Sequence, residues 1–351
     1  MLISLLVLSF LIFFHELGHF LAARYFGVKV EVFSIGFGKK IFKRQWGQTE
    51  YCLSAIPLGG YVQMKGQDDS DPTSISTDSD SYGAKTPWQR IVILFAGPFA
   101  NFLLAFLLYI IIASMGVLKL TPQIGKIGED SAAYHAGLME KDRILAINGI
   151  TIRAWDEIKP IVTQTQGAIE LLVERGSDAL LLTLTPKLSQ SQTMFGEAIQ
   201  ERLIGISPSG ETVTLYFRGL ESLGYAWNET VRAATLIVQS LKKMVEGVIS
   251  PKEMGGVISI VQITSSAADA GIVALFMLTA LISVNLGILN LLPIPALDGG
   301  HIMFNLYEMV MRKPPNEAVY TKMTYAGWGL LLCLMAFTII NDILRLSGAY
   351  Q

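Results

Sequence analysis

The chain has 351 residues, of which 51% are apolar and 16% are charged, and its mean hydropathy is +0.46. These values are typical of a polytopic membrane protein and argue against a soluble globular enzyme. The net charge of −2 and the lack of a basic stripe argue against a nucleic-acid partner.

Four apolar stretches are long enough to cross a bilayer, and they cover residues 3–25, 91–117, 272–292 and 325–340. The segment from Arg24 to Arg90 carries nine Lys or Arg residues, whereas nothing basic precedes the first stretch. The positive-inside rule therefore predicts that this segment is cytoplasmic and that both termini are extracytoplasmic. It also places the region from 120 to 270 outside the cytoplasm.

The first stretch contains the sequence His15-Glu16-Leu17-Gly18-His19. On a helix its two histidines stand one turn apart on one face. This H-E-x-x-H arrangement predicts two neutral imidazoles that bind zinc, and a glutamate between them that reaches a water molecule at the metal. Ionisable side chains at such depth cost at least ~2.5–3.5 kcal/mol each on insertion scales, which favours a functional role. A pair of satisfied buried histidines is the alternative.

Two strand-like runs follow at residues 30–38 and 51–64, and both contain glycines. One interpretation is a re-entrant β-hairpin sheet packed against the spanning helices, where protein or water satisfies its backbone. The edge of such a sheet can bind an extended peptide by strand addition. An ordinary structural hairpin is an equal alternative. Under the first interpretation, the residues expected to contact substrate are Gly36, Phe37, Gly38, Gly59 and Gly60.

Near its start the second stretch contains a Gly97-Pro98 pair and, three residues later, Asn101. A helix breaker and a polar residue at this depth indicate close helix packing, or a polar partner such as a neighbour of the metal site. A kink with a back-bonded asparagine explains them equally well.

Residues 122–210 are predicted to form a separate α+β module of short strands and two short helices. Its sequence over residues 131–149 resembles a PDZ domain of the bacterial protease-associated kind. Such domains bind chain termini or exposed apolar segments by adding a strand. The resemblance implies a peptide-binding loop in the last strand, formed by Leu203, Ile204, Gly205 and Ile206. A module that only plugs the membrane site or excludes large substrates is the alternative.

Residues 215–250 carry apolar side chains every three or four positions. The same segment also carries the basic residues Arg232, Lys242 and Lys243. This pattern predicts an amphipathic helix that lies on a membrane surface. A helix that simply packs on the preceding module is the alternative.

The third stretch ends in a break with two prolines, Pro293 and Pro295, followed by Asp298-Gly299-Gly300. Zinc bound by two histidines needs one more protein ligand and keeps a fourth position open for water. Asp298 is the predicted third ligand, because the third span runs inward and brings it to the cytosol-facing half, as the first span does for its histidines. A helix cap is the alternative. His301 is interpreted as a residue behind the ligands rather than a fourth ligand.

Taken together, the HELGH motif, the glycine-containing hairpin, the Gly-Pro and Asn of the second span, the PDZ-like insert and the Asn-x-x-Pro-x-Pro-x-Leu-Asp-Gly-Gly run resemble the site-2 protease family. The closest branch is the bacterial regulator-of-sigma-E type, although the single PDZ-like module departs from its best-known two-PDZ members. The resemblance implies one Zn²⁺ per chain and intramembrane cleavage of single-span proteins in a bacterial inner membrane. The expected substrates are an anti-sigma factor already cut by a first protease, or remnant signal peptides. It also implies that Asn290 contacts substrate.

The predicted fold is therefore a polytopic α-helical membrane protein with four transmembrane helices, a re-entrant β-hairpin sheet and one extracytoplasmic PDZ-like domain. Its expected parts are residues 1–117, 122–210, 215–250 and 251–351. Two other functions stay open. In a metal transporter the histidines would line a pathway, and in a non-catalytic membrane chaperone or sensor they would be structural.

Overall fold

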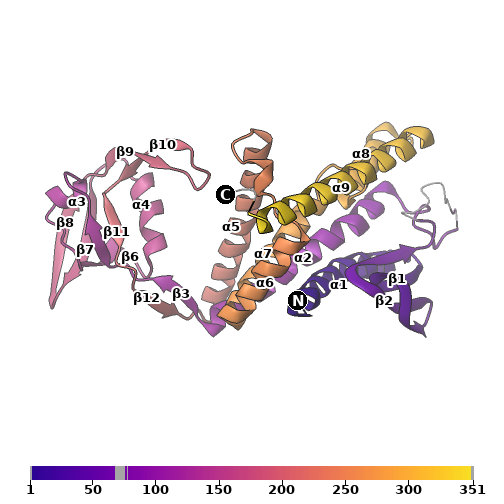
Figure 1. The fold of residues 1–351 in the computed structure, drawn as a ribbon, viewed down its shortest axis with the longest axis horizontal. Helices are drawn as coiled ribbons and strands as arrows, with labels where there is room; N and C mark the ends of the chain where they lie inside the picture. Colours follow the sequence, from indigo (N-terminus) through magenta and orange to yellow (C-terminus); the bar gives the residue numbers. More distant parts are fainter. Residues whose placement is uncertain (1, 68–75, 77, 349–351) are drawn as a thin grey trace. The chain divides into compact units, whose positions relative to one another are not determined.

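The computed structural model describes residues 2–67, 76 and 78–348. The chain divides into two compact units, one formed by Met1–Ile112 with Gly219–Gln351 and the other by Ala113–Arg218. The first unit carries the long helices and a two-stranded sheet, whereas the second carries most of the strands (Figure 1).

Four helices of the first unit are long and apolar enough to cross a membrane: α1 (Leu2–Tyr25), α2 (Pro87–Met115), α7 (Ile272–Asn290) and α9 (Glu317–Leu346). The four predicted spans are therefore confirmed by length and composition, although the last helix is longer than expected. Glycine permits α1 and α2 to touch, because a Cβ at Gly18 would lie 2.1 Å from the Ala96 carbonyl oxygen. Small residues allow such backbone contact in membranes.

Strands β1 (Val30–Trp46) and β2 (Thr49–Met64) pair antiparallel beside α1. Their register shifts several times, so Ser34 lies opposite both Cys52 and Tyr61. Residues 60–64 pair with residues 30–35 of β1, and within the described chain they pair with no other strand. This segment is thus an edge of the sheet. The hairpin itself is observed, whereas its re-entrant position in a membrane stays a prediction.

Helix α5 (Leu220–Val245) falls within the predicted amphipathic segment and contacts α7. Its apolar face is open, since Leu220, Trp227 and Val245 are more than half exposed. An open apolar face of this kind is typical of a helix at a lipid interface.

Helix α6 (Val257–Ala270), which was not predicted from the sequence, precedes α7 and follows a short 3₁₀ turn (Pro251–Glu253). Its first turn is held by the buried Asp342 of α9, which accepts hydrogen bonds from the backbone N–H groups of Gly256, Ile258 and Ser259. A carboxylate at a helix N-terminus satisfies donors that have no partner within the helix. Asp342 therefore has a structural role.

The second unit contains a four-stranded sheet with the order β6 (Ile150–Thr151), β5 (Arg143–Ile147), β7 (Ile169–Arg175) and β8 (Asp178–Leu184). The other strands pair two by two: β3 (Val117–Leu120) with β12 (Thr212–Leu215), β4 (Ile124–Ile127) with β11 (Ile206–Pro208), and β9 (Lys187–Gln192) with β10 (Ala198–Leu203). Strands β3 and β12, the first and last of this unit along the chain, and the β9–β10 hairpin were not predicted.

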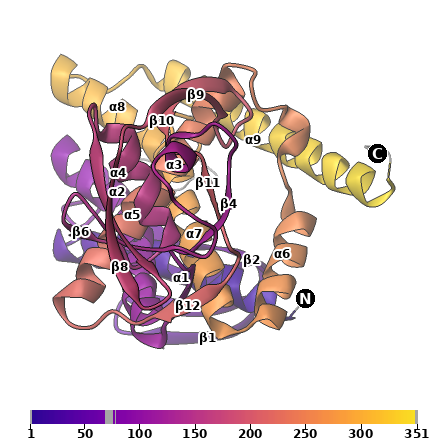
Figure 2. The same ribbon diagram turned by 90° about the vertical axis from the view of Figure 1, so that its left-hand side faces the viewer.

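Two short helices complete this unit: α3 (Ala132–His135), and α4 (Ile158–Gln164) after a 3₁₀ turn (Trp155–Glu157). Figure 2 shows α3 beside β4 and β11, where the Ala133 N–H donates to the Ile204 carbonyl. Fully buried Ile144, Ile147 and Leu171 form part of its core. The module is α+β, as predicted, and its assignment as a PDZ-like domain stays a prediction.

One buried carboxylate of the second unit predicts acid sensitivity. Asp142, which is 1% exposed, accepts hydrogen bonds from Met139 N–H and from the Arg175 guanidinium. Burial alone would raise the pKa of Asp142, but the hydrogen bonds from Arg175 and Met139 hold it below its ordinary value. Because the folded pKa is lowered, this stabilisation is present above the unfolded pKa of ~3.9 and is lost as the pH falls below it.

Asp142→Asn should remove that pH dependence and lower the free energy of unfolding of the unit by about 1.5–3 kcal/mol at neutral pH, because a hydrogen-bonded charge is lost. Hydrogen exchange of the β5 and β7 amides in the whole protein between pH 3 and 7 measures both effects. The matched control is Asp178→Asn, at an exposed position. An unchanged pH profile in Asp142→Asn would contradict the assignment.

Candidate metal centre

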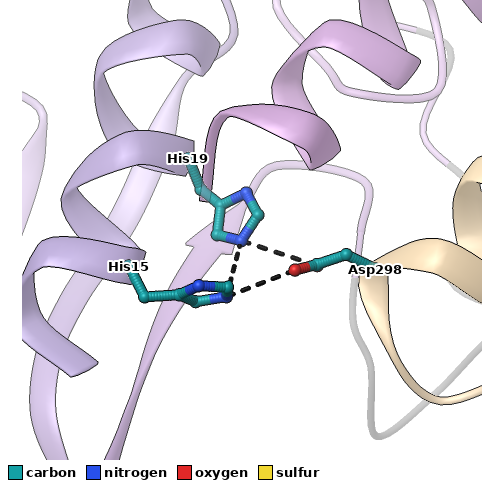
Figure 3. Close-up of side chains that lie close together, drawn as sticks. All are labelled: His15, His19 and Asp298. Carbon is teal, nitrogen blue, oxygen red and sulfur yellow. Dashed lines mark hydrogen bonds and ion pairs between the residues drawn. The ribbon is translucent and has the colours of Figure 1, made fainter. Parts of the chain in front are cut away.

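Two imidazoles and one carboxylate meet inside the first unit. His15 and His19 project from the same face of α1, and Asp298 is the first residue of α8 (Asp298–Met311), as Figure 3 shows. The His15 Nε2 lies 3.2 Å from Asp298 Oδ2 and 3.2 Å from His19 Nε2, and the His19 Nε2 lies 3.5 Å from Asp298 Oδ1. The structure thus brings together three side chains from opposite ends of the sequence that could hold a metal ion.

The spacing of these atoms fits a tetrahedral zinc site. Zinc bonds of ~2.0–2.1 Å place neighbouring ligand atoms ~3.3–3.4 Å apart, close to the separations found here. Asp298 Oδ2 is moreover buried, and apart from the His15 Nε2 it has no polar partner among the described residues. A buried oxygen of this kind needs a cation or a donor to offset its desolvation.

Both histidines are oriented from behind by α2. The His19 Nδ1 lies 2.9 Å from the Ile93 carbonyl oxygen, so it carries the proton and leaves Nε2 with a free lone pair. The His15 Nδ1 lies 3.2 Å from the Asn101 amide nitrogen, and the Asn101 amide oxygen is buried without a partner. Rotating that amide by a half turn lets the His15 Nδ1–H donate to the oxygen. Two lone pairs would then face the same point, as metal ligation requires.

Asp298 is positioned by glycines at the start of α8. A Cβ at Gly299 would lie 2.3 Å from the Leu291 carbonyl oxygen, and one at Gly300 would lie 2.3 Å from the Ile294 carbonyl oxygen. Only glycine therefore permits α8 to begin against the proline-containing loop that follows α7. The Asp-Gly-Gly sequence is explained by this close approach.

Gly97 has a similar role on α2, where a Cβ would lie 2.2 Å from His19 Nε2. Close packing and a polar partner, the two features predicted for this region, are both observed. Gly97 packs against His19, and Asn101 contacts His15.

Gly97→Ala should displace the His19 ring and weaken zinc binding by about 5- to 150-fold, because forcing a methyl group into a packed site costs about 1–3 kcal/mol. Competition with a chromogenic chelator measures the affinity. Gly329→Ala is the matched control, since a Cβ at that helical position meets nothing within 4 Å. Equal affinities in the two variants would show that the His19 ring tolerates the methyl group.

A cavity of about 830 Å³ opens onto the three ligand atoms. Glu16 lines it and packs near the sheet edge, since a Cβ at Gly60 would lie 3.3 Å from Glu16 Cγ. The predicted substrate-contacting residues Asn290, Phe37, Gly59 and Gly60 line the same cavity. So do residues that the sequence did not single out, among them Tyr61, Gln63, Tyr325 and Trp328.

Other predicted site residues lie elsewhere. Gly36 and Gly38 belong to β1 and have left-handed φ angles of 91° and 83°, which glycine adopts without strain. Leu203 lies in β10 and Ile206 in β11, so the predicted last strand is broken at Ile204 and Gly205. The four predicted loop residues, from Leu203 to Ile206, belong to the second unit. The His301 Nδ1 lies 3.1 Å from the Tyr320 hydroxyl, consistent with a supporting role.

Comparison with known proteins identifies the class. Residues 3–334 match Peptidase family M50. A Campylobacter jejuni protein named "Putative zinc metalloprotease" is 50% identical over 98% of this chain and 93% of its own length. Proteins of the same description from Helicobacter pylori J99 and Clostridium acetobutylicum are 42% and 35% identical, with coverage of 98% and 97% of this chain and 99% and 96% of theirs.

The fold and the comparisons define a multi-pass membrane metalloprotease. The chain belongs to Peptidase family M50, the site-2 protease family, as the sequence resemblance predicted. Its cofactor is zinc, and the donor set of two imidazoles and a carboxylate fits that metal.

Proposed function

We propose that this protein is an intramembrane endopeptidase that cleaves the spanning segments of single-span membrane proteins, with zinc held by His15, His19 and Asp298. The observation that carries the proposal is the convergence of these three side chains beside a cavity that is also lined by Glu16. When bound, zinc supplies Lewis-acid activation of a water molecule and of the scissile carbonyl group.

Glu16 performs the proton transfers. Its carboxylate accepts a proton from the attacking water and passes it to the leaving amine, as a general base and then a general acid. Glu16 lies next to Gly60 at the sheet edge and lines the same cavity as the three ligands. Asn290 is far from Glu16 in the sequence but lines the same cavity. It donates a hydrogen bond that orients the substrate carbonyl.

The edge segment at residues 60–64 holds the substrate. A spanning helix keeps its carbonyl groups in internal hydrogen bonds, so it must unwind before attack. Pairing with the free edge of β2 would replace those bonds in an extended strand. Tyr61, Val62 and Gln63 line the cavity, so a strand added there would pass the metal centre. Phe37 and Gly59 would contact its side chains.

The second unit controls access from outside the cytoplasm. We assign it as a PDZ-like domain whose loop from Leu203 to Ile206 binds a chain terminus, which suits a substrate already cut by a first protease. The proposed substrates are an anti-sigma factor that a first protease has already cut, and remnant signal peptides. The Lys and Arg residues between the first two spans favour a bacterial inner membrane orientation with both termini outside and the metal centre in the cytosol-facing half.

The proposal is tested with purified protein and a single-span substrate in detergent or nanodiscs, with and without a zinc chelator. Mass spectrometry of the products should place the cut inside the spanning segment, and added zinc should restore chelated enzyme. A substrate with helix-breaking residues in its span should be cut faster than one with a polyleucine span. Cuts only in soluble loops would contradict intramembrane cleavage.

A further inference from the structure

One face of α2 serves the whole metal centre. Ile93 contacts His19, Gly97 permits the His19 ring, and Asn101 contacts His15. These residues follow one another at spacings of four, so they lie on one side of the helix. Arg90, three residues before Ile93, continues the same face towards the start of α2.

Arg90 reaches the helix that carries the third ligand. Its Nη2 lies 2.7 Å from Glu308 Oε1 on α8, and the two side chains are only 16% and 20% exposed. This contact joins segments 218 residues apart in the sequence. Loss of either partner of such a mostly buried ion pair is destabilising, because the remaining charge would be buried without compensation.

Both members of the pair lie away from the metal centre along their helices. Arg90 precedes Gly97, which lies against the His19 ring, by seven residues, about 10 Å along α2, and Glu308 follows Asp298 by ten residues, about 15 Å along α8. The pair therefore joins α2 and α8 at a point separate from the metal centre.

The other contacts of helix α8 lie in its first half. Its start rests on the loop after α7, and His301 and Phe304 contact Tyr320 of α9. In its last turn, by contrast, Val310 and Met311 are more than half exposed. Metal ligands must be held within about 0.5 Å of the productive geometry, so the direction of α8 matters for its first residue.

We propose that Arg90 and Glu308 form a positioning pair that orients α8 and thereby sets the Asp298 carboxylate against the two imidazoles. The inference rests on the proposed zinc ligation. Neither residue is a ligand, so their effect on zinc acts through the packing of α8 against α2.

The test uses the full chain and the variants Arg90→Gln, Glu308→Gln and the exchange Arg90→Glu with Glu308→Arg. Zinc affinity is measured by chelator competition, and the visible absorption of the cobalt-substituted protein reports ligand geometry. Each single variant should bind zinc about 10- to 100-fold more weakly, as for other groups that orient metal ligands, and should alter the cobalt spectrum. The exchange should restore both. Arg232→Gln, at an exposed arginine, is the control.

The outcomes separate the two proposals. A wild-type protein that binds no zinc would refute the centre itself. If it does bind, folded single variants with unchanged affinity and spectrum would overturn the positioning role. If the single variants do not fold, the exchange decides, since a folded exchange variant that has lost zinc affinity shows that the ion pair does not orient α8.

Discussion

Replacing Glu16 by glutamine is expected to leave zinc bound while lowering cleavage of a single-span substrate by at least about a hundredfold, since proton transfer by a positioned base is worth 10²–10⁴. Glutamine keeps the shape of the side chain but cannot accept a proton. Glu16 is not among the three side chains whose ligand atoms converge, so the zinc stoichiometry should stay near that of the wild type. The loss should appear in kcat rather than in KM.

Zinc content by atomic absorption and cleavage by gel assay are measured on the same preparation. Glu31→Gln on β1 is the control, because Glu31 pairs with Lys29 at the surface and should leave activity unchanged. Residual cleavage by Glu16→Gln near the wild-type rate would remove Glu16 from the mechanism. Loss of zinc together with activity would instead make it a ligand.

Replacing Asp298 by asparagine is expected to abolish both zinc retention and cleavage. The neutral amide removes the one anionic ligand, and the effect should exceed the 10- to 100-fold loss of affinity typical of groups that only support a ligand. The protein should still fold, since α8 begins through the contacts of Gly299 and Gly300 with the preceding loop. Dialysis against a weak chelator followed by metal analysis measures the loss.

Asp269→Asn at an exposed position of α6 is the matched control for this change. It should retain zinc at the wild-type level. If Asp298→Asn retained a full complement of zinc, the third ligand would have to come from elsewhere in the chain, and the cluster in Figure 3 would be an ion pair only.

The local part of the centre could be predicted from the sequence because helical periodicity fixes it. A spacing of four residues places His15 and His19 on one face whatever the rest of the chain does. Asp298 was found by a different argument, from the ligand number of zinc and the direction of the third span. The sequence offered Asn101 only as one of two equal interpretations, since its role depends on how α1 packs against α2.

The missed elements depend on partners far away in the chain. Helix α6 begins where Asp342, some 86 residues later, supplies the acceptor for Gly256. Strands β3 and β12 have four residues each, and each forms by pairing with the other. Such short segments carry too little periodicity to be recognised alone. The doubled register of Ser34 in the hairpin is equally non-local.

The wide separation of the ligands along the chain has a consequence for biosynthesis. Asp298 follows His15 by 283 residues. At synthesis rates of about 5–20 residues per second, the two histidines wait about 15–60 s for their partner. If these three residues hold the zinc as proposed, the nascent chain would enter the membrane with an incomplete centre. It would then gain the ability to cleave neighbouring proteins only near the end of its synthesis.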